Sequence, residues 1–343
     1  MKITYNIYDE NGYINVPWIA SRPTWLKVII GARQVGKTYG TLKYHLDNNK
    51  PFILLRRTTE ELDFISSSPE LDPFLPFLPE YRTRIVKQAK SCMIKDYDTA
   101  GKIIPESFRG MALSLPQIAH IRGFNGSLYD SIVFDEAIPE KGVIVRKTEG
   151  ESLLNGYTTI NGNRELQGLP PTTLWLLANT NNINSSILES LNLSTTIIRM
   201  RTKGLEYMEY NGVSIFQGMS TRITEQRKNT ALAKQINPDS AFARMAYSNE
   251  WSYDTSPLVK PRSLKGMTPL CSYAGYLYIW EDQAGIYICS AKHDAAPYKD
   301  DGFSTAQFTS DYAWLEPYYA GALITFSDEL ILARFKQLFN IDY

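Results

Sequence analysis

A glycine-rich stretch near the N-terminus has the residue types and spacing of a phosphate-binding loop. It reads Gly-Ala-Arg-Gln-Val-Gly-Lys-Thr and fits the pattern G-x-x-x-x-G-K-[ST]. Such a loop closes its backbone N–H groups around phosphate oxygens, and it needs glycine where a side chain would obstruct that approach. The sequence therefore predicts a nucleoside triphosphate site formed by Gly31, Ala32, Arg33, Gln34, Val35, Gly36, Lys37 and Thr38.

Two side chains of this loop have a defined chemistry. Lys37 is predicted to reach the β- and γ-phosphates of ATP, and the Thr38 hydroxyl is predicted to hold Mg²⁺. An apolar run over 28–30 leads into the loop, and a helix-compatible run over 38–46 follows it, so that the helix N-terminus would favour negative charge. The alternative is a chance glycine turn with a surface lysine, which leaves this strand and helix unexplained.

An acidic pair supplies the second half of the predicted site. The apolar strand 131–134 ends in Asp135 and Glu136, 98 residues after Lys37. This is the Walker B pattern, in which Asp135 anchors Mg²⁺ through water and Glu136 orients or deprotonates the attacking water. Many strands end in acidic residues, so the pair gains its weight from the phosphate loop. Its glutamate favours ATP hydrolysis over nucleotide-kinase or Ras-like GTPase chemistry.

Three further features could act on the nucleotide. Asn179 follows the apolar strand 172–178 and is predicted to sense the γ-phosphate; the alternative is a turn-forming asparagine. The strand 51–57 ends in two arginines, either of which could touch nucleotide or DNA or pair with Glu60 or Glu61. The aromatic residues of 1–25 could stack on adenine or pack an N-terminal arm onto the sheet.

Arginines between the second and third strands could act on a neighbouring subunit. Arg164 is the candidate arginine finger, and Arg146 is its rival. A finger arginine is typically worth ~10³–10⁵ in kcat. If one of them has this role, activity depends on assembly.

Composition bounds the class of protein. The length of 343 residues suggests two domains with a connector, and 43% apolar and 21% charged residues are ordinary for a globular protein. No apolar run approaches membrane-spanning length, and the N-terminus lacks the apolar core of a signal peptide. The three cysteines and three histidines are scattered, which argues against a disulfide framework or a zinc site and for a reducing, intracellular location.

The charge is unevenly distributed although the net charge is zero. Residues 200–265 carry 10 Lys and Arg against 6 Asp and Glu, whereas 266–343 carry 4 against 10. This asymmetry supports DNA contact only if another argument already indicates it.

The character of the chain changes after about residue 199. Residues 200–256 are interpreted as a linker, with a hairpin around Asn211-Gly212 and a polar helix over 221–236. From 257 the sequence is rich in aromatic β-type segments, with a hairpin that turns at 281–285. The chain ends in a helix for which Ser327 is the predicted N-cap, followed by acidic residues in the first turn.

Taken in order, these pieces resemble the DNA-packaging ATPases of phi-29-like tailed bacteriophages. The resemblance rests on the phosphate loop, on Leu-Leu-Arg-Arg-Thr-Thr-Glu-Glu-Leu, on Ser-Ile-Val-Phe-Asp-Glu and on Leu-Leu-Ala-Asn. The stretch Ile121-Arg122-Gly123 is also similar to the ATPase half of phage terminase large subunits. The C-terminal segments 275–280 and 291–294 resemble the family's second domain, so the likeness covers nearly the whole chain.

The resemblance implies a fold, an activity and partners. The fold is α/β: a RecA-like P-loop ATPase domain of the ASCE class over 1–199, a helical linker over 200–256 and a smaller ribonuclease-H-like α+β domain over 257–343. The activity is ATP-driven translocation of double-stranded DNA into the viral procapsid, with ATP and Mg²⁺ as cofactors. The implied assembly is a homo-oligomeric ring, a pentamer, in the host cytoplasm and transiently at the procapsid portal; a structural packaging RNA is a further possible partner.

The resemblance also bears on two residue assignments. The family's trans-acting arginine lies in an Asn-Arg-Glu context that matches Asn163-Arg164-Glu165, but a second arginine two residues earlier corresponds here to Gly162. The second domain in this family lacks nuclease activity. The acidic residues that a two-metal nuclease would need are interpreted as solvated loop residues: Glu281, Asp282, Asp294, Asp300, Asp301 and Asp328.

Two other functions use the same loop. A small-molecule P-loop kinase would not need Glu136 after Asp135, nor a β-rich second domain. A nucleotide-switched DNA-binding module would bind ATP without turning it over.

Overall fold

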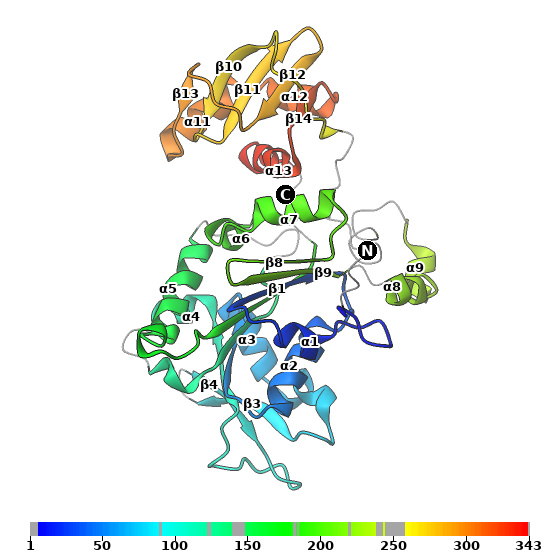
Figure 1. Ribbon diagram of the computed structural model, residues 1–343, viewed down its shortest axis with the longest axis vertical. Coiled ribbons are helices and arrows are strands. Elements are labelled where there is room, and N and C mark those ends of the chain that lie inside the picture. Colours follow the sequence, from blue (N-terminus) through cyan, green and yellow to red (C-terminus); the bar gives the residue numbers. More distant parts are fainter. Residues whose placement is uncertain are drawn as a thin grey trace.

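A nine-stranded sheet forms the centre of the first unit (Figure 1). The computed structural model describes residues 6–88, 91–121, 125–138, 148–180, 183, 185–218, 221–237, 243 and 258–341. Six neighbouring strands run parallel: β5 (Gly110–Ser114), β2 (Phe52–Arg56), β6 (Ser131–Phe134), β7 (Thr173–Ala178), β1 (Leu26–Gly31) and β9 (Val213–Gly218). Antiparallel strands complete the two edges: β4 (Ser91–Asp96) and β3 (Thr83–Gln88) beside β5, and β8 (Tyr207–Tyr210) beside β9.

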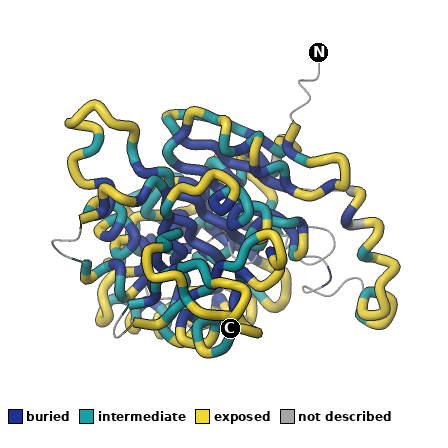
Figure 2. Tube along the Cα trace, turned by 90° about the horizontal axis from the view of Figure 1, so that it is seen from below, coloured by how far each residue is buried: buried dark blue, intermediate teal, exposed yellow. Residues whose placement is uncertain are grey.

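Helices cover both faces of this sheet, which is why its parallel strands are mostly apolar. Every residue of β1, β5 and β6 is buried, and Figure 2 shows buried residues gathered in the interior. On one face, Ile29 of β1 shares a core with α1 (Val16–Ala20), α2 (Lys37–Asp47), α3 (Thr59–Ser66) and α8 (Thr221–Lys228). On the other face, Val28 and Ile30 share a core with α4 (Leu115–Ala119), α5 (Glu149–Asn161), α6 (Ser186–Ser190) and α7 (Ser194–Thr202).

The strand order brings the predicted site residues to one edge of the sheet. β7 lies between β1, which leads into the phosphate loop, and β6, which ends before Asp135. The carboxyl ends of parallel strands share an edge, and ligands of open α/β sheets bind there. Asn179, directly after β7, is thus placed between the loop and the acidic pair.

The sheet extends beyond the predicted domain boundary at residue 199. The hairpin predicted around Asn211-Gly212 is confirmed, with positive φ at both turn residues (46° and 75°) as a tight hairpin turn requires. Its second strand, β9, pairs with β1 from Leu26↔Val213 to Gly31↔Gly218. Residues that we assigned to the linker are therefore part of the first sheet. They belong there because β9 covers an edge of β1 that would otherwise be unpaired.

The predicted helix over 221–236 is two helices. α8 ends at Lys228, and α9 (Ala231–Gln235) begins after Thr230, whose side chain accepts a hydrogen bond from the Ala233 N–H. The Thr230 side chain thus satisfies the N–H of Ala233, which at the start of a separate helix has no partner within that helix. Among the described residues, no helix is both long and apolar enough to cross a membrane.

A smaller α+β unit forms the C-terminal part of the chain. Its five-stranded sheet has the order β13 (Pro297–Tyr298), β10 (Thr268–Tyr273), β11 (Leu277–Asp282), β12 (Gly285–Cys289) and β14 (Ile324–Phe326). Its helices are α11 (Gly302–Asp311), α12 (Leu315–Ala320) and α13 (Glu329–Leu338), and they share a separate apolar core with the sheet. The predicted fold class, an α/β ATPase sheet followed by a smaller α+β unit, is confirmed.

The last helix begins one residue later than predicted. Asp328, not Ser327, is the N-cap of α13: its carboxylate accepts hydrogen bonds from the N–H groups of Leu330 and Ile331, both at 3.0 Å. A carboxylate also interacts favourably with the positive end of the helix dipole, which a serine hydroxyl does less well.

The two units meet through α13 and α7, which lie next to each other in Figure 1. Arg201 of α7 donates to Glu329 of α13 at 2.7 Å. Arg334 of α13 pairs with Glu189 of α6, and its guanidinium lies 4.5 Å from the ring centre of Tyr276. The contact thus includes paired charges, and Ala333 of α13 also packs against the core of the first unit.

Short 3-10 turns fill the connections of the first unit: η1 (Pro69–Leu71), η2 (Leu75–Phe77), η3 (Gly126–Leu128) and η4 (Glu165–Gln167).

Candidate active site

The phosphate loop has the backbone that its sequence requires. It leaves β1 at Gly31 and enters α2 at Lys37, with Gly36 as the N-cap at φ 87°. Gln34 also has positive φ, 62°, a conformation that few residues other than glycine adopt. Positive-φ residues in such a loop point successive N–H groups toward one concavity, where an anion binds.

Lys37 lies folded back into this concavity. Its Nζ donates to the carbonyls of Gly31 (2.9 Å) and Ala32 (2.7 Å) and to Oδ1 of Asn179 (2.9 Å). Burial of the ammonium lowers the pKa of Lys37 to about 8, although the nearby Asp135 carboxylate opposes that shift. A buried ammonium whose hydrogen bonds go to neutral oxygens is well suited to receive a phosphate, because the phosphate would supply the missing negative charge.

The acidic pair lies directly across from the loop. Thr38 Oγ1 donates to Asp135 Oδ1 at 2.9 Å, so the two predicted metal ligands already touch. A hydroxyl and a carboxylate are hard oxygen donors of the kind that Mg²⁺ takes when it also binds substrate phosphates. Glu136 follows at φ 57° and is about half exposed, so its carboxylate can reach the pocket. These residues fit Mg²⁺ and a triphosphate.

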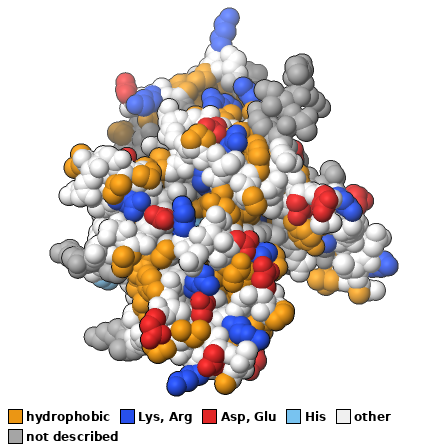
Figure 3. All heavy atoms as spheres, turned by 60° about the horizontal axis from the view of Figure 1, so that its bottom comes forward, with side chains coloured by type: hydrophobic (Ala, Val, Ile, Leu, Met, Phe, Trp, Pro, Cys, Tyr) orange, Lys and Arg blue, Asp and Glu red, His pale blue; other side chains and the backbone are white. Residues whose placement is uncertain are grey.

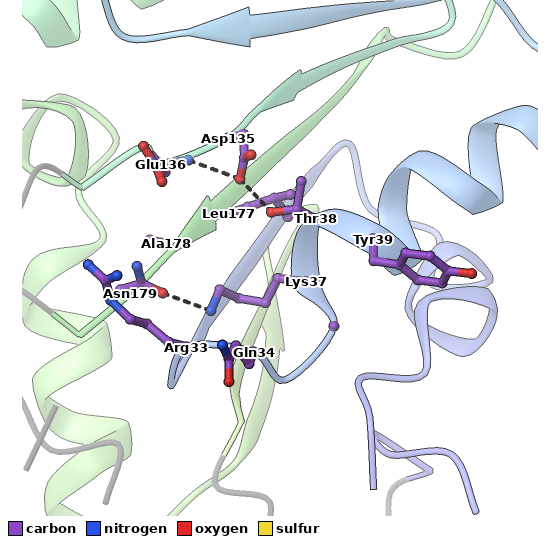
Figure 4. Close-up of a pocket in the computed structure, with 11 residues that line it drawn as sticks. Arg33, Gln34, Lys37, Thr38, Tyr39, Asp135, Glu136, Leu177, Ala178 and Asn179 are labelled. Carbon is purple, nitrogen blue, oxygen red and sulfur yellow. Dashed lines mark hydrogen bonds between the residues drawn. The ribbon is translucent and has the colours of Figure 1, made fainter. Parts of the chain in front are cut away.

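A pocket of about 330 Å³ connects these groups (Figure 4). Asn179 extends toward Lys37 from the tip of β7, and the Arg33 side chain lies beside it. Of the predicted loop residues, Gly31, Ala32 and Val35 do not line the pocket; Gly31 and Ala32 contribute carbonyls to Lys37 instead. The pocket is lined by Arg33, Gln34, Gly36, Lys37, Thr38, Tyr39, Asp135, Glu136, Leu177, Ala178 and Asn179.

A second, more apolar pocket of about 630 Å³ adjoins the first. The two share Gln34, Gly36 and Tyr39, and the N-terminal segment contributes Tyr13. Of the N-terminal aromatic residues, Trp18 packs edge-on against Tyr207 and Phe216, as expected of an arm that packs on the sheet. Tyr13 lines the second pocket, and its stacking on adenine stays a prediction.

Arg56 is the site residue that sequence reasoning left undecided. Its guanidinium donates to Asp135 Oδ2 at 2.8 Å and to Glu136 Oε2 at 3.3 Å, and it lies 3.8 Å from Glu61. It therefore holds both acidic side chains. The only signal in the sequence was its place at the carboxyl end of β2, which pairs with β6. Its neighbour Arg57 is turned away into a buried ion pair with Glu149.

Arg164 is not near this pocket in its own chain. Its guanidinium donates to Pro170 O (2.9 Å), Ser127 O (3.5 Å) and Asp130 Oδ1 (3.3 Å). Asp130 directly precedes β6, whereas Asp135 directly follows it. Arg164 thus lies at the opposite edge of the sheet, because the five steps of extended chain from Asp130 to Asp135 span about 16 Å. Arg146 and Arg122 lie outside the described residues.

Four of the six acidic residues considered for a nuclease site in the C-terminal unit have structural partners. Asp301 and Asp328 cap α11 and α13, Asp282 pairs with Arg262, and Asp300 accepts from the Tyr273 hydroxyl at 3.0 Å. Within the described ranges, no three His, Cys, Asp or Glu side chains gather as metal ligands would.

The loop, the intervening strand and the acidic strand tip define the chain as a P-loop ATPase. The family model for the podovirus DNA encapsidation protein (Gp16) matches residues 8–307. The chain belongs to this family and is a phage DNA-packaging ATPase, as the sequence analysis predicted.

Three solved structures are similar to the chain. The chain is similar to the DNA-packaging motor gp11 of Phi-28, with a TM-score of 0.54 and 14% identity over 97% of this chain and 99% of that one. It also matches the N-terminal domain of the DNA-packaging ATPase of bacteriophage phi29 (23% identity, TM-score 0.44, 61% and 97% of the two chains). A third match is the large terminase ATPase domain of Thermus phage P74-26 (15% identity, TM-score 0.38, 68% and 91%). No curated protein sequence matches the chain.

Proposed function

We propose that this chain moves double-stranded DNA into the viral procapsid by hydrolysing ATP in a ring of identical subunits. The observation that carries the proposal is the set of Lys37, Thr38 and Asp135 around one pocket with Glu136 at its side, in a member of the DNA encapsidation family. Neither the kinase nor the switch alternative is favoured by a specific contact.

Each pocket residue has a role in this proposal. Lys37 leaves its three neutral acceptors and neutralises phosphate charge, while Thr38 and Asp135 hold the metal. When bound, Mg²⁺ would neutralise the charge that develops on the transferred phosphoryl group. Glu136 orients the attacking water and accepts its proton, and Arg56 keeps both carboxylates facing the pocket.

Asn179 would couple the nucleotide state to movement. Its amide oxygen accepts from Lys37, so phosphate binding would release it. The chain then leads from Asn179 into α6 and α7, which carry Glu189 and Arg201. These are the two residues that pair with α13 of the C-terminal unit. A change at the tip of β7 thus has a short covalent route to the interface between the units.

Arg164 would act on the ATP of a neighbouring subunit. It lies at the edge of the sheet opposite its own pocket, so it can reach a triphosphate only across a head-to-tail contact between subunits, which closes into a ring. To do so it must exchange its carbonyl and Asp130 contacts for phosphate oxygens. The rival Arg146 has the same proposed role.

The second pocket would receive the adenine base. Tyr13 and Tyr39 give it aromatic walls beside the phosphate loop, and aromatic rings stack well on a planar base.

DNA would be held through its phosphates. Residues 200–265 have an excess of basic residues, 10 against 6. By contrast, the face shown in Figure 3 intersperses Lys and Arg with Asp and Glu, so it offers no basic patch of one sign. The ring would assemble in the host cytoplasm and dock on the procapsid portal, with a packaging RNA as a further possible partner and without nuclease activity.

ATP turnover with and without duplex DNA tests this proposal. We expect duplex DNA to stimulate phosphate release. We also expect the affinity for DNA to fall steeply from low to physiological salt, because each phosphate that the protein neutralises makes the slope of log affinity against log salt more negative by about 0.9. Affinity that stays flat over this range would contradict DNA binding through phosphates. Transfer of phosphate to a nucleoside rather than to water would support the kinase.

Nucleotide binding should depend on pH through Lys37. Its pKa is lowered to about 8 in the free protein, whereas bound phosphates favour the ammonium form and raise that pKa. Binding therefore takes up a proton above pH 8, and affinity should fall about tenfold for each pH unit from there. Equilibrium binding of an ATP analogue between pH 7 and 9.5 measures this. In Lys37→Arg, whose guanidinium stays protonated over this range, the affinity that remains should not depend on pH. If the affinity of the wild type did not depend on pH either, Lys37 would not be the phosphate-binding group.

A further inference from the structure

A helix of the predicted linker is attached to the phosphate loop by one arginine. Arg227 of α8 donates through Nη1 to the carbonyl of Arg33 at 2.6 Å, across 194 residues of sequence. The helix is also held by Ile223, which is buried in the same core as Val35 of the loop. Arg222 adds a hydrogen bond to the carbonyl of Glu10. α8 is therefore docked against the loop and the N-terminal segment.

The position of this carbonyl gives the contact its significance. A trans peptide is planar, so the carbonyl of Arg33 and the N–H of Gln34 point in opposite directions. Arg227 binds the carbonyl from the side of α8, and this fixes the N–H of Gln34 on the other side of the peptide. Gln34 lines the phosphate pocket. The hydrogen bond thus sets the orientation of a donor that the phosphates would use.

The same peptide leads into a strained residue. Gln34 is held at φ 62° without being glycine, and such conformations persist only where surrounding contacts fix them. The bond from Arg227 to the preceding carbonyl is one such contact. Arg227 therefore acts on the loop through the geometry of this hydrogen bond.

We propose that Arg227 is a positioning residue of the nucleotide site, which holds the Arg33–Gln34 peptide in its phosphate-binding orientation and makes the docking of α8 depend on the bound nucleotide. Because such coupling is reciprocal, any movement of the linker that withdraws Arg227 would weaken nucleotide binding, and nucleotide binding would hold α8 in place. This inference rests on the proposed nucleotide site and on no property of DNA or the ring.

Nucleotide binding without DNA tests the proposal. We expect Arg227→Ala to weaken binding of a non-hydrolysable ATP analogue about tenfold, the size of a lost hydrogen bond from a charged donor. Arg227→Lys should recover part of this loss because an ammonium can also donate to the carbonyl. The matched control is Lys228→Ala, next along the helix, whose side chain pairs with Glu225 at 2.7 Å; it should bind within twofold of wild type. Affinity of Arg227→Ala within twofold of wild type would overturn the proposal.

A further readout separates positioning from a merely structural role. In the wild type, the amides of α8 should exchange hydrogen more slowly when the analogue is bound, and unchanged exchange would overturn the coupling even if Arg227→Ala did not fold. If the wild type bound no nucleotide at all, the proposed function itself would fail.

Discussion

Replacing Glu136 with glutamine should lower ATP turnover by about 10²–10⁴-fold while leaving ATP affinity within a few-fold of wild type, the range typical for loss of a general base. Glutamine keeps the size of the side chain, and its amide oxygen can still accept from Arg56, which contacts Glu136 at 3.3 Å. It cannot accept the proton of the attacking water. Phosphate release and analogue binding, measured on the same preparation, check both halves.

Glu61→Gln is the matched control for this change. Glu61 is another carboxylate beside Arg56, at 3.8 Å, but it does not line the pocket. Its replacement should leave turnover near the wild-type value. If Glu136→Gln turned ATP over at the wild-type rate, the catalytic assignment would be wrong, and the nucleotide-switched binding module would become the better account.

Replacing Arg164 with alanine should abolish turnover in the assembled ring, with a loss of about 10³–10⁵ in kcat if it is the trans-acting finger. Nucleotide binding by the single chain should persist, because Arg164 lies at the far edge of the sheet from its own pocket. Mixing this variant with Glu136→Gln should restore part of the activity. In such a mixture, some sites combine an intact Glu136 from one subunit with an intact Arg164 from its neighbour.

Arg109→Ala is a suitable control because Arg109 directly precedes the parallel strand β5 and, like Arg164, pairs with an aspartate, Asp96 at 2.9 Å. It should retain turnover. The unfolding temperature of Arg164→Ala must be compared with that of wild type, since the guanidinium also holds the carbonyls of Ser127 and Pro170. Mixtures no more active than the two variants alone would exclude Arg164 from a shared site and favour Arg146.

The chemistry of the site could be predicted from local sequence because its parts are strand tips. The phosphate loop, the acidic pair and Asn179 each follow an apolar run, and the parallel strands bring the three to one edge. Nothing in this step depends on which distant segments pair. The prediction of the central fold came from the family resemblance that these local patterns carry.

The parts that the sequence did not predict all depend on distant partners. β9 reads as one arm of a hairpin, and its pairing with β1 has no local signature, so the first domain was ended too early. The acidic partners of Arg56 lie 79 and 80 residues away, and the partner of Arg227 lies 194 residues away. The N-cap at Asp328 was missed by one residue because Ser327 and Asp328 are both good caps.

The most direct test of the account is DNA packaging itself. Linear double-stranded DNA is incubated with cognate procapsids, ATP and either wild-type chain or Glu136→Gln, and the length of DNA protected from nuclease is then measured. We predict protection that grows with time and ATP for the wild type and none for Glu136→Gln, although that variant still binds ATP. Equal protection by the variant or in the absence of ATP, or wild-type ATP turnover without protected DNA, would contradict an ATP-driven packaging motor.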